Sequence, residues 1–161
     1  MREMNILEFH AKNVSDTERL GRALAESLPD GAVIALIGTL GAGKTRLVQA
    51  AAEASGVEAG VVVSPTFVLI QEYRDGIRPV YHFDTYRLRD EDEFLELGPE
   101  EYFDGEGLTF IEWADKVEDC LPRRRLEVRI LIEGAGARRF ELVPYGDEFV
   151  EAVRLIAESL Q

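Results

Sequence analysis

The stretch from Ile34 to Ala50 reads IALIGTLGAGKTRLVQA and contains three glycines, the last of them followed directly by a lysine and a threonine. The segment from Gly38 to Thr45 matches the pattern G-x-x-x-x-G-K-[ST] at every fixed position. Glycines allow backbone angles that other residues avoid, so their N–H groups can point at phosphate oxygens. An apolar run enters the loop and a helix-like run leaves it, which adds the positive end of a helix. The stretch therefore predicts a phosphate-binding loop, called the glycine loop below (residues 38–45).

The fixed positions of the glycine loop each have a chemical task. Lys44 supplies a mobile positive charge for the β- and γ-phosphates of a nucleotide, and the Thr45 hydroxyl is placed to ligate Mg²⁺. The residues expected to contact a bound nucleotide here are Gly38, Gly41, Ala42, Gly43, Lys44, Thr45 and Arg46.

A phosphate site of this kind needs a carboxylate that helps to hold Mg²⁺, usually at the end of a neighbouring apolar strand. Two acids meet this requirement, because Asp84 ends the run VYHFD and Glu112 ends the run LTFIE. At this point either acid is a candidate for direct contact with the metal.

Other motifs separate the classes of nucleotide-binding protein. The sequence has no N-K-x-D guanine-reading motif and no D-x-x-G after a predicted strand, which argues against a GTPase. A small-metabolite kinase stays open as an alternative. Many such kinases cover the phosphates with an arginine-rich lid, whereas the dense arginine cluster at 123–125 comes just before a predicted strand.

Periodic patterns predict the elements that must position these residues. Ser15 and Glu18 have capping-box spacing, so we expect Ser15 to cap a helix that carries Leu20, Leu24 and Leu28. Strands are predicted over 32–37, 61–64, 66–73, 78–84, 108–113, 126–133 and 138–145, with a tight hairpin turn at Asp75-Gly76. Further helices are predicted over 44–54, over 90–98, and at the end of the chain, where Phe149, Val153, Ile156 and Leu160 share one face.

Helices and buried strands alternate early, and a β-rich section follows. This order predicts an α/β fold of the P-loop NTPase type, a three-layer sandwich whose central parallel strands are extended by antiparallel strands. The length of 161 residues fits a single domain over 1–161.

Composition limits the functions that are open to the chain. The formal net charge is −13, so the chain lacks the basic footprint of an autonomous nucleic-acid binder. The acidic run at 90–96 predicts either a solvated helix face or a docking surface for a basic partner. Cys120 is the single cysteine, and no apolar run is long enough to cross a bilayer, so we expect a cytoplasmic protein without a disulfide.

Several further motifs resemble those of the TsaE family (also called YjeE), the P-loop ATPases of tRNA threonylcarbamoyladenosine (t6A) biosynthesis. They are SDTERLG at 15–21, LGAGKT at 40–45, SPTFVLIQEY at 64–73, YHFDTYRL at 81–88, LGPEEYF at 97–103 and LTFIEWADK at 108–116. One departure is Thr39, because family members often carry Asp or Glu at this position.

The resemblance implies roles for individual residues. Thr45 and Glu112 would hold Mg²⁺, Lys44 the terminal phosphates, and Asp84 would act near the γ-phosphate through water or metal. The remaining implied sites are a nucleotide-sensing switch at Ser64, Pro65 and Thr66, an adenine border at Val14 (within 13–17) and Arg138 or its neighbour Arg139, and partner-facing or site-shaping residues at Tyr86, Arg87 and Trp113. His82 is either a packed strand histidine or a functional member of its motif.

By this resemblance, the chain would bind ATP and Mg²⁺, hydrolyse ATP slowly on its own, and drive turnover of a TsaB–TsaD threonylcarbamoyl transferase. It would meet tRNA only indirectly, through that complex. The alternatives are a small-metabolite kinase and a non-catalytic adaptor that uses ATP only to dock.

Overall fold

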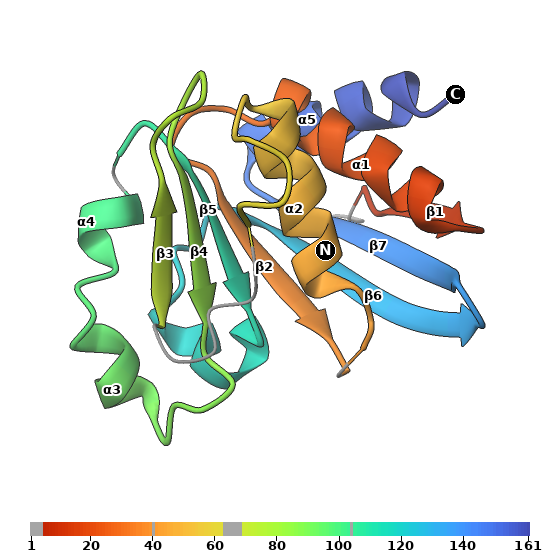
Figure 1. Cartoon of the computed structure of the whole chain (residues 1–161). Helices are drawn as coiled ribbons and strands as arrows, with labels where there is room; N and C mark the ends of the chain where they lie inside the picture. The colour runs from red at the N-terminus through yellow and green to blue at the C-terminus, as the bar shows by residue number, and fades with distance from the viewer. Residues whose placement is uncertain (1–4, 40, 63–68, 104) are drawn as a thin grey trace.

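The computed structural model describes residues 5–39, 41–62, 69–103 and 105–161. Within these ranges the chain forms a seven-stranded sheet with the order β1-β7-β6-β2-β5-β4-β3 (Figure 1). The strands are β1 (Leu7–Ala11), β2 (Val33–Gly38), β3 (Ile70–Tyr73), β4 (Val80–Asp84), β5 (Leu108–Glu112), β6 (Arg125–Gly134) and β7 (Ala137–Tyr145). The α-helices are α1 (Val14–Ser27), α2 (Lys44–Ala54), α3 (Glu91–Leu95), α4 (Glu100–Phe103) and α5 (Asp147–Ser159), and a 3₁₀ segment covers Ala114–Cys120.

The centre of the sheet is parallel and its two sides are antiparallel. Strands β6, β2, β5 and β4 run parallel to one another. At one side of the sheet β3 pairs antiparallel with β4, and at the other side β7 pairs antiparallel with both β6 and β1. The predicted α/β fold with antiparallel additions is confirmed. Because β2, β4 and β5 are parallel, their carboxyl ends lie at one edge of the sheet.

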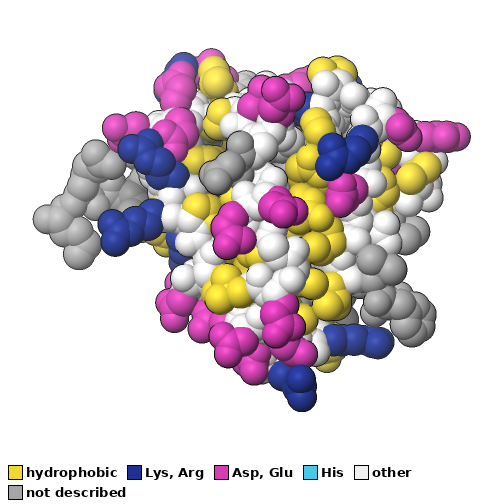
Figure 2. All heavy atoms as spheres, turned by 90° about the vertical axis from the view of Figure 1, so that its left-hand side faces the viewer, with side chains coloured by type: hydrophobic (Ala, Val, Ile, Leu, Met, Phe, Trp, Pro, Cys, Tyr) yellow, Lys and Arg dark blue, Asp and Glu magenta, His cyan; other side chains and the backbone are white. Residues whose placement is uncertain are grey.

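Two hydrophobic clusters fill the space on the two faces of the sheet. Ile34 and Leu36 of β2 pack with buried residues of α1, α2 and α5, while Val33 and Ala35 of the same strand pack with α3 and the 3₁₀ segment. Both faces of β2 are therefore covered, which explains its unbroken apolar sequence. Figure 2 shows the face over α3, α4 and β3, where Asp and Glu side chains gather around apolar ones.

The first helix begins differently from the prediction. Asn13, in extended conformation, is the residue that caps α1, and its side-chain oxygen accepts a hydrogen bond from the Asp16 N–H at 3.0 Å. The prediction of Ser15 as the cap is therefore wrong. Ser15 already lies inside the helix, and Glu18 pairs with Arg46 of α2 instead of reaching back to a cap.

The predicted hairpin forms, but its turn is not tight. The last paired residues are Tyr73 and Val80, so six residues connect the strands. The loop closes against the end of α2, where the Ile77 N–H donates to the Ser55 carbonyl at 2.6 Å. A Cβ on Gly76 would lie 2.3 Å from that same carbonyl, so this glycine is required by close packing.

Two other predictions about strands need correction. Residues 61 and 62 lie in no strand, and the rest of the predicted strand 61–64 lies outside the described residues. In addition, the edge strand β1 has no counterpart among the predicted elements. Its apolar positions Leu7 and Phe9 alternate with Glu8 and His10, which is the pattern of a half-buried strand.

No helix in the described part of the chain is both long and apolar enough to cross a membrane.

Candidate functional site

The glycine loop connects the end of β2 directly to the start of α2. Gly41 and Gly43 have φ values of +81° and +104°, the left-handed region that favours glycine. A Cβ at either position would meet nothing within 4 Å, so the backbone conformation rather than space selects glycine. Gly43 is the N-terminal residue flanking α2 and provides no side-chain cap, which leaves the first N–H groups of the helix available to an anion.

Lys44 is buried, with 5% of its surface exposed. Its Nζ donates to the carbonyls of Gly38, at 2.7 Å, and Thr39, at 3.0 Å, and lies 4.0 Å from the centroid of the Trp113 ring. Burial lowers the pKa of Lys44, while the nearby Glu112, Asp84 and Asp115 act in the opposite direction. The ammonium group is thus held at the loop by carbonyls, a ring face and surrounding carboxylates.

One oxygen of Glu112 has two hydrogen-bond partners. The Thr45 hydroxyl donates to Oε2 at 2.9 Å, and His82 Nε2 lies 2.5 Å from the same atom. Glu112 is 4% exposed and His82 is fully buried. The hydroxyl and the carboxylate that were predicted to share a metal therefore lie in direct contact, with a histidine behind them.

Asp84 ends β4, the strand beside β5, as Glu112 ends β5. It is the register partner of Glu112 in the parallel pairing of β4 with β5. Its Oδ1 accepts a hydrogen bond from the Tyr86 N–H at 3.0 Å, which closes the turn after β4. Both acids thus end neighbouring strands at the edge where the glycine loop begins.

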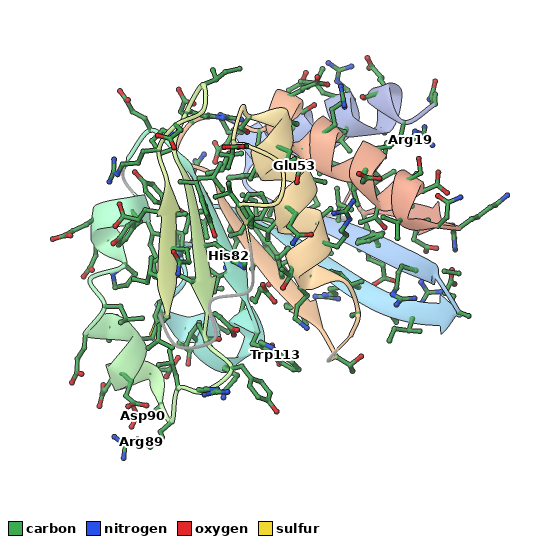
Figure 3. The ribbon with its side chains drawn as sticks, in the orientation of Figure 1. Arg19, Glu53, His82, Arg89, Asp90 and Trp113 are labelled. Carbon is green, nitrogen blue, oxygen red and sulfur yellow. The ribbon has the colours of Figure 1, made fainter. Side chains whose placement is uncertain are left out.

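Trp113 follows Glu112 directly and is the one described non-glycine residue with a positive φ, at +59°. The Thr85 hydroxyl lies 2.7 Å from its carbonyl oxygen, and the Tyr86 ring packs on it with centroids 4.8 Å apart. A left-handed backbone is unfavourable for a bulky side chain, and it persists where surrounding contacts fix it. Here the conformation places the indole over Lys44, at the end of β5 (Figure 3).

Arg138 reaches the glycine loop from the β6–β7 hairpin. Its guanidinium donates to the carbonyls of Ala42, at 3.0 Å, and Gly41, at 3.1 Å, and also to those of Gly134 and Ala137 in its own hairpin. Arg139 instead lies near the carboxylates of Glu133 and Glu141. Of the two arginines, Arg138 is therefore the one in contact with the loop.

The other predicted residues lie at varying distances from this centre. Val14 is exposed at the start of α1, three residues after Ala11, which is the register partner of Arg138. Arg46 pairs with Glu18 at 2.8 Å and so links α2 to α1. Tyr86 and Arg87 are exposed. The predicted switch residues Ser64, Pro65 and Thr66 lie outside the described part of the chain.

The donor set fits Mg²⁺ that is shared with a nucleotide. In the described ranges no group of three or more His, Cys, Asp or Glu side chains forms a metal cage. Mg²⁺ bound with a phosphate substrate needs only one or two protein oxygens, because phosphates and water complete its shell. The Thr45 hydroxyl and the Glu112 carboxylate, 2.9 Å apart, meet that requirement.

Two residues of this site have no functional role that the sequence alone assigns. For His82 the sequence leaves packing and function open, and its contact with Glu112 connects it to the site. Thr85, which was not singled out, lies within hydrogen-bond distance of the carbonyls of Glu112 and Trp113. A period of two along H-x-D places His82 and Asp84 on the same face of β4, and that signal was available in the sequence.

Together, the fold and the site define an α/β protein in which a central parallel strand passes through a G-x-x-x-x-G-K-[ST] loop into a helix, beside two strand-end carboxylates. The family model described as "Threonylcarbamoyl adenosine biosynthesis protein TsaE" matches residues 11–140. The chain belongs to the TsaE family, and its role is in t6A biosynthesis.

Relatives and a solved structure agree with this assignment. The chain is 38% identical over 146 residues to the t6A biosynthesis protein TsaE of Bacillus subtilis (strain 168), covering 91% of this chain and 90% of that protein. It is 44% identical over 118 residues to TsaE of Synechocystis, covering 70% and 73%. The crystal structure of Bacillus subtilis YdiB matches with a TM-score of 0.85 and 31% identity, covering 98% of both chains.

Proposed function

We propose that the chain is a cytoplasmic, Mg²⁺-dependent ATPase that drives turnover of a TsaB–TsaD threonylcarbamoyl transferase in t6A biosynthesis. The observation that carries the proposal is the meeting of four groups at one sheet edge. Lys44 lies on the glycine loop, Thr45 touches Glu112, and Asp84 is the register partner of Glu112. Family membership supplies the biosynthetic context.

Each residue of the site would have its own role in ATP binding and hydrolysis. Lys44 and the N–H groups at the start of α2 would bind the β- and γ-phosphates, while Thr45 and Glu112 would hold Mg²⁺. Bound Mg²⁺ would neutralise charge that develops on the phosphate oxygens. Asp84 would orient the attacking water, directly or through the metal.

The positions of the arginines beside the site are the reason to expect slow hydrolysis by the chain alone. Phosphoryl transfer to water is accelerated when an arginine reaches the transferring group. Arg46 is held by Glu18, and Arg138 by backbone carbonyls. We therefore expect activity to rise when a partner completes the site, and Tyr86, Arg87 and Trp113 lie at the edge where such a partner would meet it. The tRNA would be reached only through this complex.

The decisive measurement is ATP hydrolysis by the full chain, alone and with added TsaB–TsaD, for the wild type and for Lys44→Ala. We expect stimulation by the complex, and a loss on the order of 10²- to 10³-fold in Lys44→Ala, which is typical when one donor to a developing charge is removed.

Two other outcomes would contradict the proposal. Tight ATP binding without hydrolysis in either condition, together with full t6A formation, would indicate a non-catalytic adaptor. Phosphate transfer to a nucleoside or sugar acceptor would indicate a small-metabolite kinase.

A further inference from the structure

We propose that His82 is a positioning residue of the Mg²⁺ site, which holds the Glu112 carboxylate in place through an Nε2–H···Oε2 hydrogen bond. This inference rests on the proposed function, because it concerns the same metal and nucleotide. It assigns a role to a buried histidine that packing alone does not explain.

Strand geometry places His82 directly behind the metal-binding oxygens. Val80, two residues earlier on β4, belongs to the cluster packed against α2, whereas Tyr81 and Phe83 belong to the opposite cluster. Because side chains alternate along a strand, His82 points to the same face of the sheet as Val80, which is the face covered by α2. Figure 3 shows His82 on β4, and none of its side chain is exposed.

The contact with Glu112 fixes the proton on the imidazole ring. An ionised carboxylate only accepts hydrogen bonds, so the 2.5 Å contact with Oε2 assigns the hydrogen of this pair to Nε2. In the described part of the chain, Nδ1 is buried without a hydrogen-bond partner. A hydrogen on Nε2 rather than on Nδ1 gives Glu112 its partner and leaves no unpaired N–H of the ring buried. This arrangement favours a ring that acts as a fixed donor.

The two donors to Glu112 differ in what happens to them when Mg²⁺ is bound. The Thr45 hydroxyl, 2.9 Å from Oε2, is itself an expected metal ligand, so its hydrogen bond to Glu112 would be exchanged for the metal. His82 lies too deep to contact solvent and belongs to a strand of the parallel centre. It is therefore the anchor that remains on the carboxylate in both states.

Loss of such an anchor has a recognisable signature. Removing a group that orients a metal ligand typically lowers metal affinity about 10- to 100-fold, while groups that bind phosphate are untouched. Lys44 and the glycine loop do not contact His82 in any described hydrogen bond. The effect should therefore appear in the Mg²⁺ dependence of nucleotide binding and not in binding without metal.

The test uses the full chain and calorimetric titration with ATP, in EDTA and in Mg²⁺. The variants are His82→Met, which removes the donor, and His82→Gln, whose amide offers an N–H at a similar distance from the backbone. Thr109→Val is the matched control, since Thr109 is fully buried on the neighbouring strand β5 and its hydroxyl has no described partner.

We expect His82→Met to reduce the gain in affinity that Mg²⁺ gives by about 10- to 100-fold, with unchanged affinity in EDTA. His82→Gln should recover most of the gain, and Thr109→Val should keep all of it. Equal losses with and without Mg²⁺, or no loss in His82→Met, would overturn the inference while leaving the proposed function intact. A wild-type chain that binds no nucleotide would overturn both.

A second measurement covers the case in which His82→Met does not fold. Proton–nitrogen-15 NMR spectra of the wild-type chain should show a slowly exchanging, strongly downfield proton on Nε2 of His82. This signal should persist when Mg²⁺ and ADP are added. A ring with its hydrogen on Nδ1 instead would overturn the assignment.

Discussion

Replacing Arg138 with alanine should weaken nucleotide binding through the backbone of the glycine loop. The guanidinium bridges the loop and the β6–β7 hairpin by donating to four carbonyls, two of them at Gly41 and Ala42. In a trans peptide the N–H points opposite to the C=O. Holding the Ala42 carbonyl therefore turns the Gly43 N–H away from Arg138, toward the side where a phosphate is expected.

The size of the effect follows from the contacts that are lost. A typical hydrogen bond contributes about 0.5–1.5 kcal/mol net, and this partly exposed guanidinium makes two with the loop. The loop would thus lose roughly 1–3 kcal/mol of ordering free energy. If nucleotide binding must restore this order, affinity falls about 5- to 140-fold, since about 1.4 kcal/mol corresponds to a factor of ten.

The assay is titration with Mg·ATP and Mg·GTP for the wild type, Arg138→Ala and Arg139→Ala. Arg139 is the matched control, because its carboxylate partners are Glu133 and Glu141 and not the loop. A clamp on the loop predicts equal losses for both nucleotides. A loss confined to ATP would refute this reasoning and indicate that Arg138 reads the adenine, as family resemblance suggests.

Three further predictions concern single contacts. Asn13→Ala should lower the free energy of unfolding by about 1 kcal/mol, as loss of a helix cap does, whereas Ser15→Ala should change it little; urea denaturation compares them, and the reverse order would contradict the observed cap. Nucleotide binding should change the emission of Trp113, the single tryptophan, because Lys44 lies 4.0 Å from its ring centroid and must turn toward phosphate; identical spectra with and without ATP would contradict this movement. Gly21→Ala should lower the melting temperature, because its Cβ would lie 2.4 Å from a methyl group of α2, and overpacking of about 1–3 kcal/mol outweighs a helix-propensity gain of about 1 kcal/mol; an unchanged melting temperature would show that the helices move apart freely.

The sequence predicts the parts of the site that depend on local pattern. The glycine loop, the helix over 44–54 and the acids Asp84 and Glu112 each lie inside or at the end of a segment with clear periodicity. The register of β4 with β5 then places the two acids opposite each other at the ends of their strands. The arrangement of these residues at one sheet edge follows from the topology.

Contacts between distant segments were not predictable in the same way. Arg138 lies 96 residues from Ala42 in sequence. The sequence alone does not say which of Arg138 and Arg139 faces the glycine loop, because that depends on the register of the β6–β7 hairpin. Asn13 and the predicted cap Ser15 are both good capping residues, so their side-chain chemistry alone does not choose between them. The choice of Asn13 follows from where β1 ends, and that edge strand is too short to give a strong pattern.

The two halves of the site differ in how far they must rearrange to accept a ligand. On the side proposed to hold Mg²⁺, Glu112 is already in contact with His82 in the buried centre of the sheet. On the phosphate side, the Lys44 ammonium is engaged by the Gly38 and Thr39 carbonyls and the Trp113 ring, so an incoming phosphate must compete for it. Binding free energy at Lys44 is therefore a difference between two occupied states, whereas Glu112 is preorganised. It follows that variants of Lys44 should alter nucleotide affinity with and without Mg²⁺, while variants of His82 should alter only the Mg²⁺-dependent part.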